Sequence, residues 1–343
     1  MGKIVRLIDK IIMINSTIPK IIFNYEEYLI NGNYKIDPSL SYVYLENRKI
    51  DFIEESWDFK CLSKLNLVVR KVIIKIFSKN IIIKSSSKKF LGNTLKVNRY
   101  QSNIKIYDTI NNKVLTIFKL EKDMLNELKI RKLFGKHFNI VDYEFDIDNN
   151  FIIEDMIDNI KIDIEKKYHL FLNDYKKYFN KISKEEYKYL DIDKFFLKYK
   201  NTILSKEINK YRKKINLKMP IVLMHGDIGD LNMIFNKKIY YIDFEKTKKN
   251  YFLYDFFRFQ LDQLLYNNDY TFINNYFEGV YDEYLFDYFD SFNIKFDKND
   301  RCFYFLIFIL MNIEDENIFS FFINENKKNT EVEKIKYLIK KYL

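Results

Sequence analysis

The residues best suited to chemistry lie between Leu223 and Phe235, where the sequence reads LMHGDIGDLNMIF. Apolar residues flank this stretch on both sides, so a short polar loop is anchored at each end. Such anchoring holds polar side chains rigidly at a surface cleft. Asp227 and Asn232 are separated by four residues. One carboxylate that could accept a proton and one amide oxygen that could bind a cation therefore lie on a single loop.

A second polar block, IYYIDFE, follows a tight connection at residues 236–238. The strands MIF and IYYID are expected to pair as a hairpin, which would return Asp243 beside Asn232. Asn and Asp oxygens are ligands that Mg²⁺ accepts, with phosphate oxygens and water completing the shell. The spacing of Asp227 and Asn232 is that of the catalytic loop of kinases, in which the Asp accepts a hydroxyl proton and the Asn binds Mg²⁺. The two blocks together predict phosphoryl transfer.

Short runs of β-branched and aromatic residues precede this region. NTLKVNRY, NIKIYD and KVLTIFKL predict three antiparallel strands, and residues 109–112 predict the hairpin turn between the last two. The segment 121–134 has apolar residues near helical spacing and predicts a helix. Two further strands are expected at 138–144 and 151–157, around a turn at 148–150.

The rest of the chain is expected to be helical. Residues 159–219 contain no glycine and predict several helices that end near Pro220, and the chain is again helical after Asp255. Strands with one helix, followed by a long helical part, indicate a two-lobed α+β fold. The expected domains are an N-terminal extension of unknown role at 1–87, a small antiparallel β-sheet lobe at 88–158 and a helical lobe at 159–343. In the extension, residues 62–77 form a basic amphipathic segment that suits packing on a neighbouring lobe or contact with a membrane surface.

HGDIGDLN followed by IDFE resembles the motif block of the aminoglycoside phosphotransferase and choline kinase superfamily, whose members share the two-lobed protein-kinase-like fold. The resemblance implies that Asp227 is the catalytic base and that Asn232 and Asp243 bind Mg²⁺. His225 would support the loop. YDFFRF resembles the later Asp motif of the same family, which implies that Asp255 steadies the catalytic loop through hydrogen bonds.

The β-rich segment also resembles that family, and the resemblance as a whole covers roughly residues 88–260. QSNIKIYD is similar to the nucleotide loop and second strand and places Ser102 in the loop. VLTIFK is similar to the third strand, which makes Lys119 the expected contact of the α- and β-phosphates of ATP. FIIEDMI resembles the hinge, including Glu154 and Met156, whose backbone would hydrogen-bond the adenine. GTP remains possible as the donor, because a hinge reads the base mainly through its backbone.

The sequence departs from the family pattern at several points. The hairpin between Asn232 and Asp243 is short, and the glycine-rich phosphate loop is missing. The partner of Lys119 is expected to be Glu127, with Glu121 and Glu154 as alternatives. Only eleven residues separate Asp243 from Asp255, and nothing there resembles the activation segment of a protein kinase. A nucleotide-binding scaffold without turnover, a pseudokinase, is the alternative function.

Composition narrows the partners. Hydrophobic residues are 48% of the chain, which is enough for a sizeable core. The 58 basic residues exceed the 48 acidic residues and give a net charge of +10, and the basic residues are scattered along every segment. No nucleic-acid-binding motif is visible, so no nucleic-acid partner is expected. The two cysteines, the lack of a signal peptide and the lack of an apolar run of about 20 residues favour a cytoplasmic protein without a transmembrane segment, with peripheral membrane contact possible. The oligomeric state is not indicated.

The acceptor is the least specified part of the prediction. A small polar molecule is expected: an aminoglycoside, a choline-like amino alcohol, a sugar or an envelope glycan. Residues 281–290 (YDEYLFDYFD) interleave aromatic residues with carboxylates and could attract an amine through cation–π contacts. The same pattern also fits an amphipathic helix with an acidic outer face.

Overall fold

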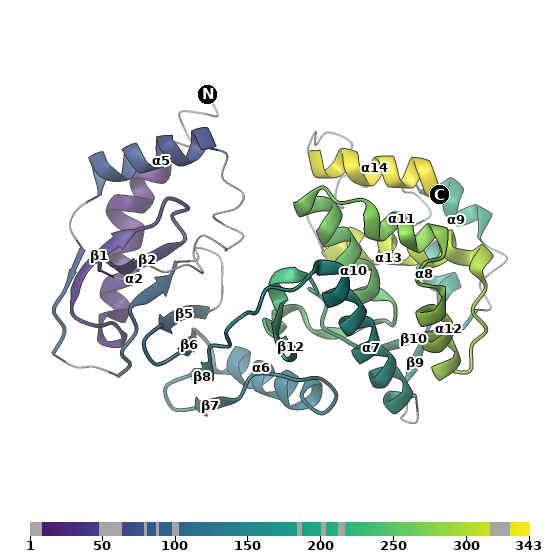
Figure 1. Ribbon diagram of the computed structural model, residues 1–343, viewed down its shortest axis with the longest axis horizontal. Helices are drawn as coiled ribbons and strands as arrows, with labels where there is room; N and C mark the ends of the chain where they lie inside the picture. Colours follow the sequence, from purple (N-terminus) through teal and green to yellow (C-terminus); the bar gives the residue numbers. More distant parts are fainter. Residues whose placement is uncertain are drawn as a thin grey trace. The chain divides into compact units, whose positions relative to one another are not determined.

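The computed structural model describes residues 9–47, 64–78, 81–86, 89–97, 103–183, 187–199, 204–211, 217–315 and 330–343. The chain divides into two compact units (Figure 1). The first consists of Met1–Lys129 and Val141–Asp158, and the second of Ile130–Ile140 and Asn159–Leu343. The first is built around a β-sheet and the second mainly from helices, so the expected α+β organisation is confirmed.

The first unit contains an eight-stranded antiparallel sheet with the order β3-β1-β2-β4-β5-β6-β8-β7. Its strands are β1 (Gly32–Ile36), β2 (Tyr42–Leu45), β3 (Ile81–Ile83), β4 (Thr94–Lys96), β5 (Asn103–Asp108), β6 (Lys113–Phe118), β7 (Tyr143–Asp146) and β8 (Phe151–Asp155). The helical segments are a π-helical turn (Met13–Thr17), α2 (Ile18–Tyr25), a 3₁₀ turn (Glu26–Tyr28), α5 (Lys64–Phe77) and α6 (Glu121–Phe134), whose last turn belongs to the second unit.

The hairpin of β5 and β6 has its turn at the predicted residues 109–112. Asp108 pairs with Lys113, and the connecting turn ends at Asn112, whose φ of 54° is one that asparagine tolerates. The Asp108 carboxylate accepts hydrogen bonds from the backbone N–H groups of Ile110 (3.0 Å) and Asn111 (3.1 Å), which fixes the turn. Helix α6 has the predicted bounds.

The strand predicted at 138–144 is largely wrong, since β7 begins only at Tyr143. The preceding residues are used by the second unit instead. Tyr241 donates its backbone N–H to the carbonyl of Asn139 (2.9 Å), and Ile140 forms a bridge with Tyr241. The apolar residues at the start of the predicted strand are therefore buried outside the sheet.

The residues expected to form an N-terminal extension (1–87) and a small lobe (88–158) lie largely in the same compact unit. Strands β1, β2 and β3 extend the sheet at the edge of β4, where Tyr42 of β2 pairs with Lys96. Side chains from the extension and from the predicted small lobe share one core, whose members include Ile18, Ile22, Val43, Leu95, Ile106 and Leu115. Covering an exposed strand edge with further strands is a physical reason for this fusion.

Helix α5 lies within the segment predicted to be amphipathic. Ile73 is buried in the core of its own unit, and Arg70 donates to the carbonyl of Ser39 (2.8 Å). The side chains of Val68, Val72 and Ile76 are exposed. The helix therefore packs through one face and leaves apolar side chains on another.

The second unit contains the motif residues. Its helices are α7 (Ile164–Ile182), α8 (Ile192–Lys198), α9 (Ser205–Lys210), α10 (Tyr254–Asp262), α11 (Thr271–Glu278), α12 (Asp282–Ser291), α13 (Arg301–Asp315) and α14 (Thr330–Tyr342), with shorter helical turns at Asp230–Asn232, Phe244–Lys246, Gln263–Asn267 and Lys298–Asp300. Strands β9 (Lys188–Leu190), β10 (Met219–Met224) and β13 (Lys248–Tyr251) form one small sheet, and β11 (Met233–Asn236) and β12 (Lys238–Tyr241) form a hairpin.

Aromatic side chains dominate the core of the second unit. Tyr168, Phe171 and Phe179 of α7 are fully buried, as are Phe257 and Phe259 of α10. The apolar run at residues 303–310 is the buried part of α13. Among the described residues, no helix is both long and apolar enough to cross a membrane.

Candidate functional site

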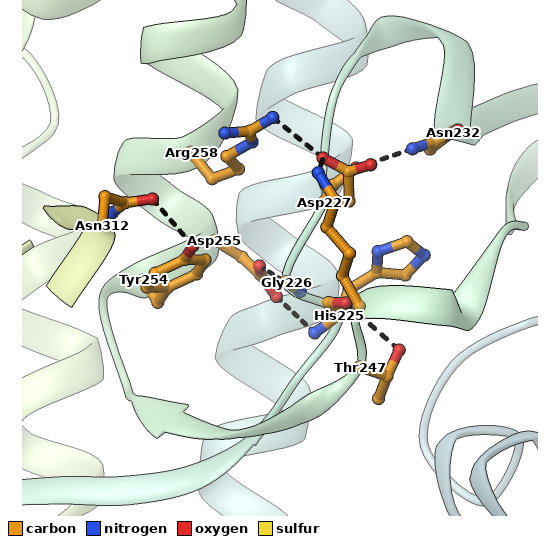
Figure 2. Close-up of polar contacts among 10 residues, drawn as sticks. His225, Gly226, Asp227, Asn232, Thr247, Tyr254, Asp255, Arg258 and Asn312 are labelled. Atoms are coloured by element: carbon orange, nitrogen blue, oxygen red, sulfur yellow. Dashed lines mark hydrogen bonds and ion pairs between the residues drawn. The ribbon is translucent and has the colours of Figure 1, made fainter. Parts of the chain in front are cut away.

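The polar loop begins where β10 ends, and helix α10 holds its first two residues. The buried carboxylate of Asp255 accepts hydrogen bonds from the backbone N–H groups of His225 (2.7 Å) and Gly226 (2.8 Å), as Figure 2 shows. It also accepts a hydrogen bond from the hydroxyl group of Tyr175 (2.5 Å). Burial raises the pKa of Asp255, and the His225 charge and these hydrogen bonds oppose that shift. The geometry is that of a carboxylate bracing a loop, the role expected of Asp255.

His225 is enclosed by aromatic rings and is fully buried. Its Nε2 atom lies 2.9 Å from the carbonyl oxygen of Ile242, so Nε2 carries the proton in this contact. The rings of Phe134 and Phe244 lie 5.7 Å and 5.2 Å from it. Burial lowers the pKa of His225, although Asp255 and the hydrogen bond to Ile242 act in the other direction. Through this contact the imidazole links the start of the loop to the residue before Asp243.

Gly226 allows a second, closer link. Its φ is 84°, and a Cβ atom added there would lie 2.3 Å from the backbone carbonyl oxygen of Lys246. Only glycine accepts both the left-handed conformation and this approach. The hydroxyl group of Thr247 also donates to the carbonyl of His225 (3.1 Å). The polar loop and the turn after Asp243 are thus held against each other by backbone packing and a hydrogen bond.

Asp227, the predicted base, is held by two cations. Its Oδ1 atom lies 2.9 Å from Nη2 of Arg258 (Figure 2) and 3.1 Å from Nζ of Lys246. The Arg258 side chain is 5% exposed and that of Lys246 is 51% exposed. A buried guanidinium is a pre-organised partner that fixes the orientation of a carboxylate. Asp227 is therefore oriented from α10 on its buried side.

Asn232 and Asp243 are brought together by the predicted hairpin, which is confirmed. Met233 pairs with Tyr241 and Asn236 with Lys238, and the Ile242 N–H donates to the carbonyl of Asn232 (3.2 Å). The amide nitrogen of Asn232 donates to the backbone carbonyl of Asp227 (2.8 Å). Its amide oxygen is thus the atom that could coordinate a cation. Asp243 follows with a φ of 66°, in the left-handed region that is rare for residues other than glycine and is frequent at functional sites.

Asn232 directly precedes β11 and Asp243 follows β12. One amide oxygen and one carboxylate are oxygen ligands that suit Mg²⁺, which binds few protein oxygens and completes its shell with phosphate and water. No group of three His, Cys, Asp or Glu side chains in the described ranges is arranged to hold a metal by itself. The oxygen donors of Asn232 and Asp243 are of the type that Mg²⁺ accepts beside phosphate oxygens.

Two charged residues that were not predicted complete the surroundings of the loop. The buried Lys167 of α7 donates to both the carbonyl (2.9 Å) and the carboxylate (2.6 Å) of Asp230. Asp262 of α10 lies so close to Gly229 that a Cβ atom added there would be 2.7 Å from a carboxylate oxygen. Burial raises the pKa of Asp262 to about 7, with Arg258 opposing the shift. Helices α7 and α10 both anchor the loop through charged side chains.

The residues expected to bind the nucleotide lie in the first unit. Lys119 is exposed directly after β6, and Glu127 is buried in α6. Glu154 lies in β8, where it pairs with Val114 and Tyr143, and Met156 follows that strand. The Met156 N–H donates to the carbonyl of Asn112 (2.7 Å), so this donor is already engaged. Ser102 lies outside the described residues.

Residues 282–290 of the aromatic and acidic segment lie in helix α12, and Tyr281 precedes the first turn. Tyr281 and Tyr288 are buried in the core, Asp282 forms an ion pair with Arg301, and Asp287 forms one with Lys176 (2.5 Å). These contacts agree with the simpler interpretation of the segment, an amphipathic helix whose carboxylates lie on the outer face.

No protein-family model matches the sequence, and no curated protein matches it. Solved structures with a similar arrangement include the amicoumacin kinase hAmiN in complex with AMP-PNP, Ca²⁺ and Ami, with 11% identity over 72% of this chain and 87% of that one at a TM-score of 0.45. A choline/ethanolamine kinase family protein from Mesorhizobium loti is 11% identical, with 72% of this chain and 86% of that chain covered and a TM-score of 0.43. The ADP-bound aminoglycoside phosphotransferase APH(2'')-Ib is 15% identical, with 71% of this chain and 90% of that chain covered and a TM-score of 0.40. These structures belong to the superfamily that the motif residues resemble.

Proposed function

We propose that the protein is an ATP- and Mg²⁺-dependent phosphotransferase that phosphorylates a hydroxyl group of a small polar molecule. The proposal rests mainly on how the polar loop and the hairpin are joined. The Asn232 side chain donates a hydrogen bond to the Asp227 carbonyl (2.8 Å), and the pairing of β11 with β12 returns the chain from Asn232 to Asp243. This proximity of the three segments supports Asp227 as the proton acceptor and Asn232 and Asp243 as the cation ligands of phosphoryl transfer.

In the proposed reaction, Asp227 receives the hydrogen bond of the acceptor hydroxyl group and orients its oxygen toward the γ-phosphorus. The new oxygen–phosphorus bond forms as the bond from the γ-phosphorus to the bridging oxygen of ADP breaks, and the hydroxyl proton passes to Asp227. Asn232 and Asp243 would hold Mg²⁺, which supplies positive charge to the phosphate oxygens when bound. Arg258 keeps Asp227 in one orientation throughout.

The acceptors we propose are aminoglycosides, choline-like amino alcohols, and sugars or envelope glycans. The carboxylates Asp282 and Asp287 of α12 are engaged in ion pairs, so this helix offers less free negative charge to a polycation than its sequence suggests. An amino alcohol or a sugar is accordingly a better first choice than an aminoglycoside for the assay.

The experiment is a phosphate-transfer assay of the full chain with ATP or GTP and Mg²⁺ across a panel of amino alcohols, sugars and aminoglycosides. Asp227→Ala and Asp243→Ala are compared with the wild type, and Asp290→Ala, on the exposed part of α12, is the matched control. Loss of the base is expected to lower the rate by about 10²–10⁴-fold. Nucleotide binding without transfer to any acceptor would support the alternative, a nucleotide-binding scaffold.

A further inference from the structure

Two cations converge on one oxygen atom of Asp227, and they differ in their surroundings. Arg258 reaches Oδ1 from the buried helix α10 at 2.9 Å, and Lys246 reaches the same atom from the exposed side at 3.1 Å. The carboxylate carries one negative charge, and the buried guanidinium already supplies a partner that cannot move away without losing its own packing. The pairing of Lys246 is half exposed, and such pairs contribute little to stability. The ammonium group can therefore leave Asp227 at small cost.

The backbone of Lys246 is placed firmly, although its side chain is not buried. The residue ends the 3₁₀ turn Phe244–Lys246, which begins directly after Asp243. Its carbonyl lies against Gly226, where an added Cβ atom would approach to 2.3 Å, and the next residue, Thr247, is hydrogen-bonded to His225. The position from which the side chain extends is thus fixed with respect to the loop that carries Asp227.

The Lys246 side chain extends toward the place where the proposed reaction would occur. In that reaction Asp227 would hold the acceptor hydroxyl group, and Asn232 and Asp243 would hold the Mg²⁺ that neutralises the phosphate oxygens. The transferred phosphoryl group must lie between these two places. Lys246 is three residues after Asp243, and its Nζ atom lies at hydrogen-bond distance from Asp227. Its ammonium group therefore reaches the space that the transferred group crosses.

We propose that Lys246 is a further catalytic residue, whose ammonium group leaves Asp227 and binds an oxygen of the γ-phosphoryl group during transfer. This inference rests on the proposed function. As the acceptor oxygen bonds to phosphorus, the bond to the ADP oxygen breaks and the hydroxyl proton passes to Asp227. Lys246 stays protonated and offsets charge on the equatorial phosphoryl oxygens. Arg258 keeps Asp227 paired after Lys246 has turned away, so the carboxylate is never left without a cation.

The test compares Lys246→Met with Lys249→Met, a matched control on the exposed face of β13. Affinities for ATP and for ADP, both with Mg²⁺, are measured on the full chain by calorimetry, and this readout needs no acceptor. Lys246→Met is expected to weaken ATP binding by about tenfold or more while leaving ADP binding unchanged, because ADP lacks the group that Lys246 contacts. With a working acceptor, kcat should fall by about 10²-fold and the acceptor KM should change little.

The outcomes separate the two proposals. Suppose that the wild type binds ATP with Mg²⁺, and that Lys246→Met weakens the binding of ATP and of ADP equally or leaves both unchanged. The role of Lys246 is then refuted, and the proposed function stands. If the wild type binds no nucleotide, both proposals fail. A loss of ATP preference in Lys249→Met of the same size would also refute the assignment, since a general loss of surface charge would then explain it.

Discussion

The bracing of the loop by Asp255 leads to a prediction whose size follows from the structure. The side chain is fully buried and accepts three hydrogen bonds, from the backbone N–H groups of His225 and Gly226 and from the hydroxyl group of Tyr175. Asp255→Asn preserves the shape but replaces one acceptor oxygen with an N–H₂ group that faces a donor. One hydrogen bond is lost and a backbone N–H group is left unpaired in the core.

The expected cost combines opposing effects. A hydrogen bond to a charged acceptor contributes about 1.5–3 kcal/mol, and an unpaired buried donor costs about 1–3 kcal/mol. Burial raises the pKa of Asp255, so removing its charge recovers part of a desolvation cost. We therefore expect Asp255→Asn to lower the free energy of unfolding by about 2–4 kcal/mol, which corresponds to a decrease in Tm of about 5–15 °C for a unit of this size.

Tyr175→Phe is the matched comparison, because it removes only the hydroxyl donor and leaves both backbone contacts intact. Its expected cost is about 1 kcal/mol. Thermal unfolding followed by circular dichroism measures both variants, and the phosphate-transfer assay should show a larger loss for Asp255→Asn. If Asp255→Asn unfolds at the same temperature as Tyr175→Phe, or above it, the bracing role inferred for the carboxylate is wrong.

Three further substitutions test other parts of the site. Gly226→Ala should lower the free energy of unfolding by about 1–3 kcal/mol from backbone strain alone, and it should reduce phosphate transfer strongly because the new Cβ atom would meet the carbonyl of Lys246. An active variant with an unchanged Tm would contradict this. Lys167→Met should destabilise the chain by about 1–3 kcal/mol by leaving polar atoms of the loop unpaired, which urea unfolding measures. Asp262 has a pKa raised to about 7, so its protonated form stabilises the fold below pH 4 and this contribution is lost as the pH rises through 7. The charged groups that face it are Arg258, Asp227 and Asp230. Asp262→Asn should remove this pH dependence, so that the free energies of unfolding of wild type and variant change relative to each other by up to about 4 kcal/mol between pH 4 and pH 8 in urea titrations. Parallel pH curves for the two proteins would refute this role of Asp262.

The hairpin that carries Asn232 and Asp243 could be predicted because its signals are local. A tight polar connection between two apolar runs specifies the pairing by itself, and the structure has that pairing. Helix α6 and the β5–β6 hairpin were predictable for the same reason. The pairing of β1, β2 and β3 at the edge of β4 was not predictable, because it joins segments far apart in the sequence and each of these strands has only three to five residues.

The charged partners of the loop were missed for a related reason. Arg258 lies 31 residues from Asp227 and Lys246 lies 19 residues from it, so no local spacing connects them. A single lysine also carries little information in a chain with 58 basic residues. One signal was available for α12, since Tyr281 and Tyr288 are seven residues apart and such residues share a helix face. That spacing favours core packing of the two rings over exposure to a ligand.

The measurement that tests the central claim most directly is the rate of acceptor-dependent ADP formation from ATP and Mg²⁺ by wild type, Asp227→Asn and Asp290→Asn. Asp227→Asn keeps the size of the side chain and a possible contact with Arg258 but removes the proton acceptor. The account predicts turnover by wild type and by Asp290→Asn, and a decrease of about 10²–10⁴-fold for Asp227→Asn at an unchanged fold. Turnover by Asp227→Asn at the wild-type rate would contradict the assignment of this loop as the site of phosphoryl transfer.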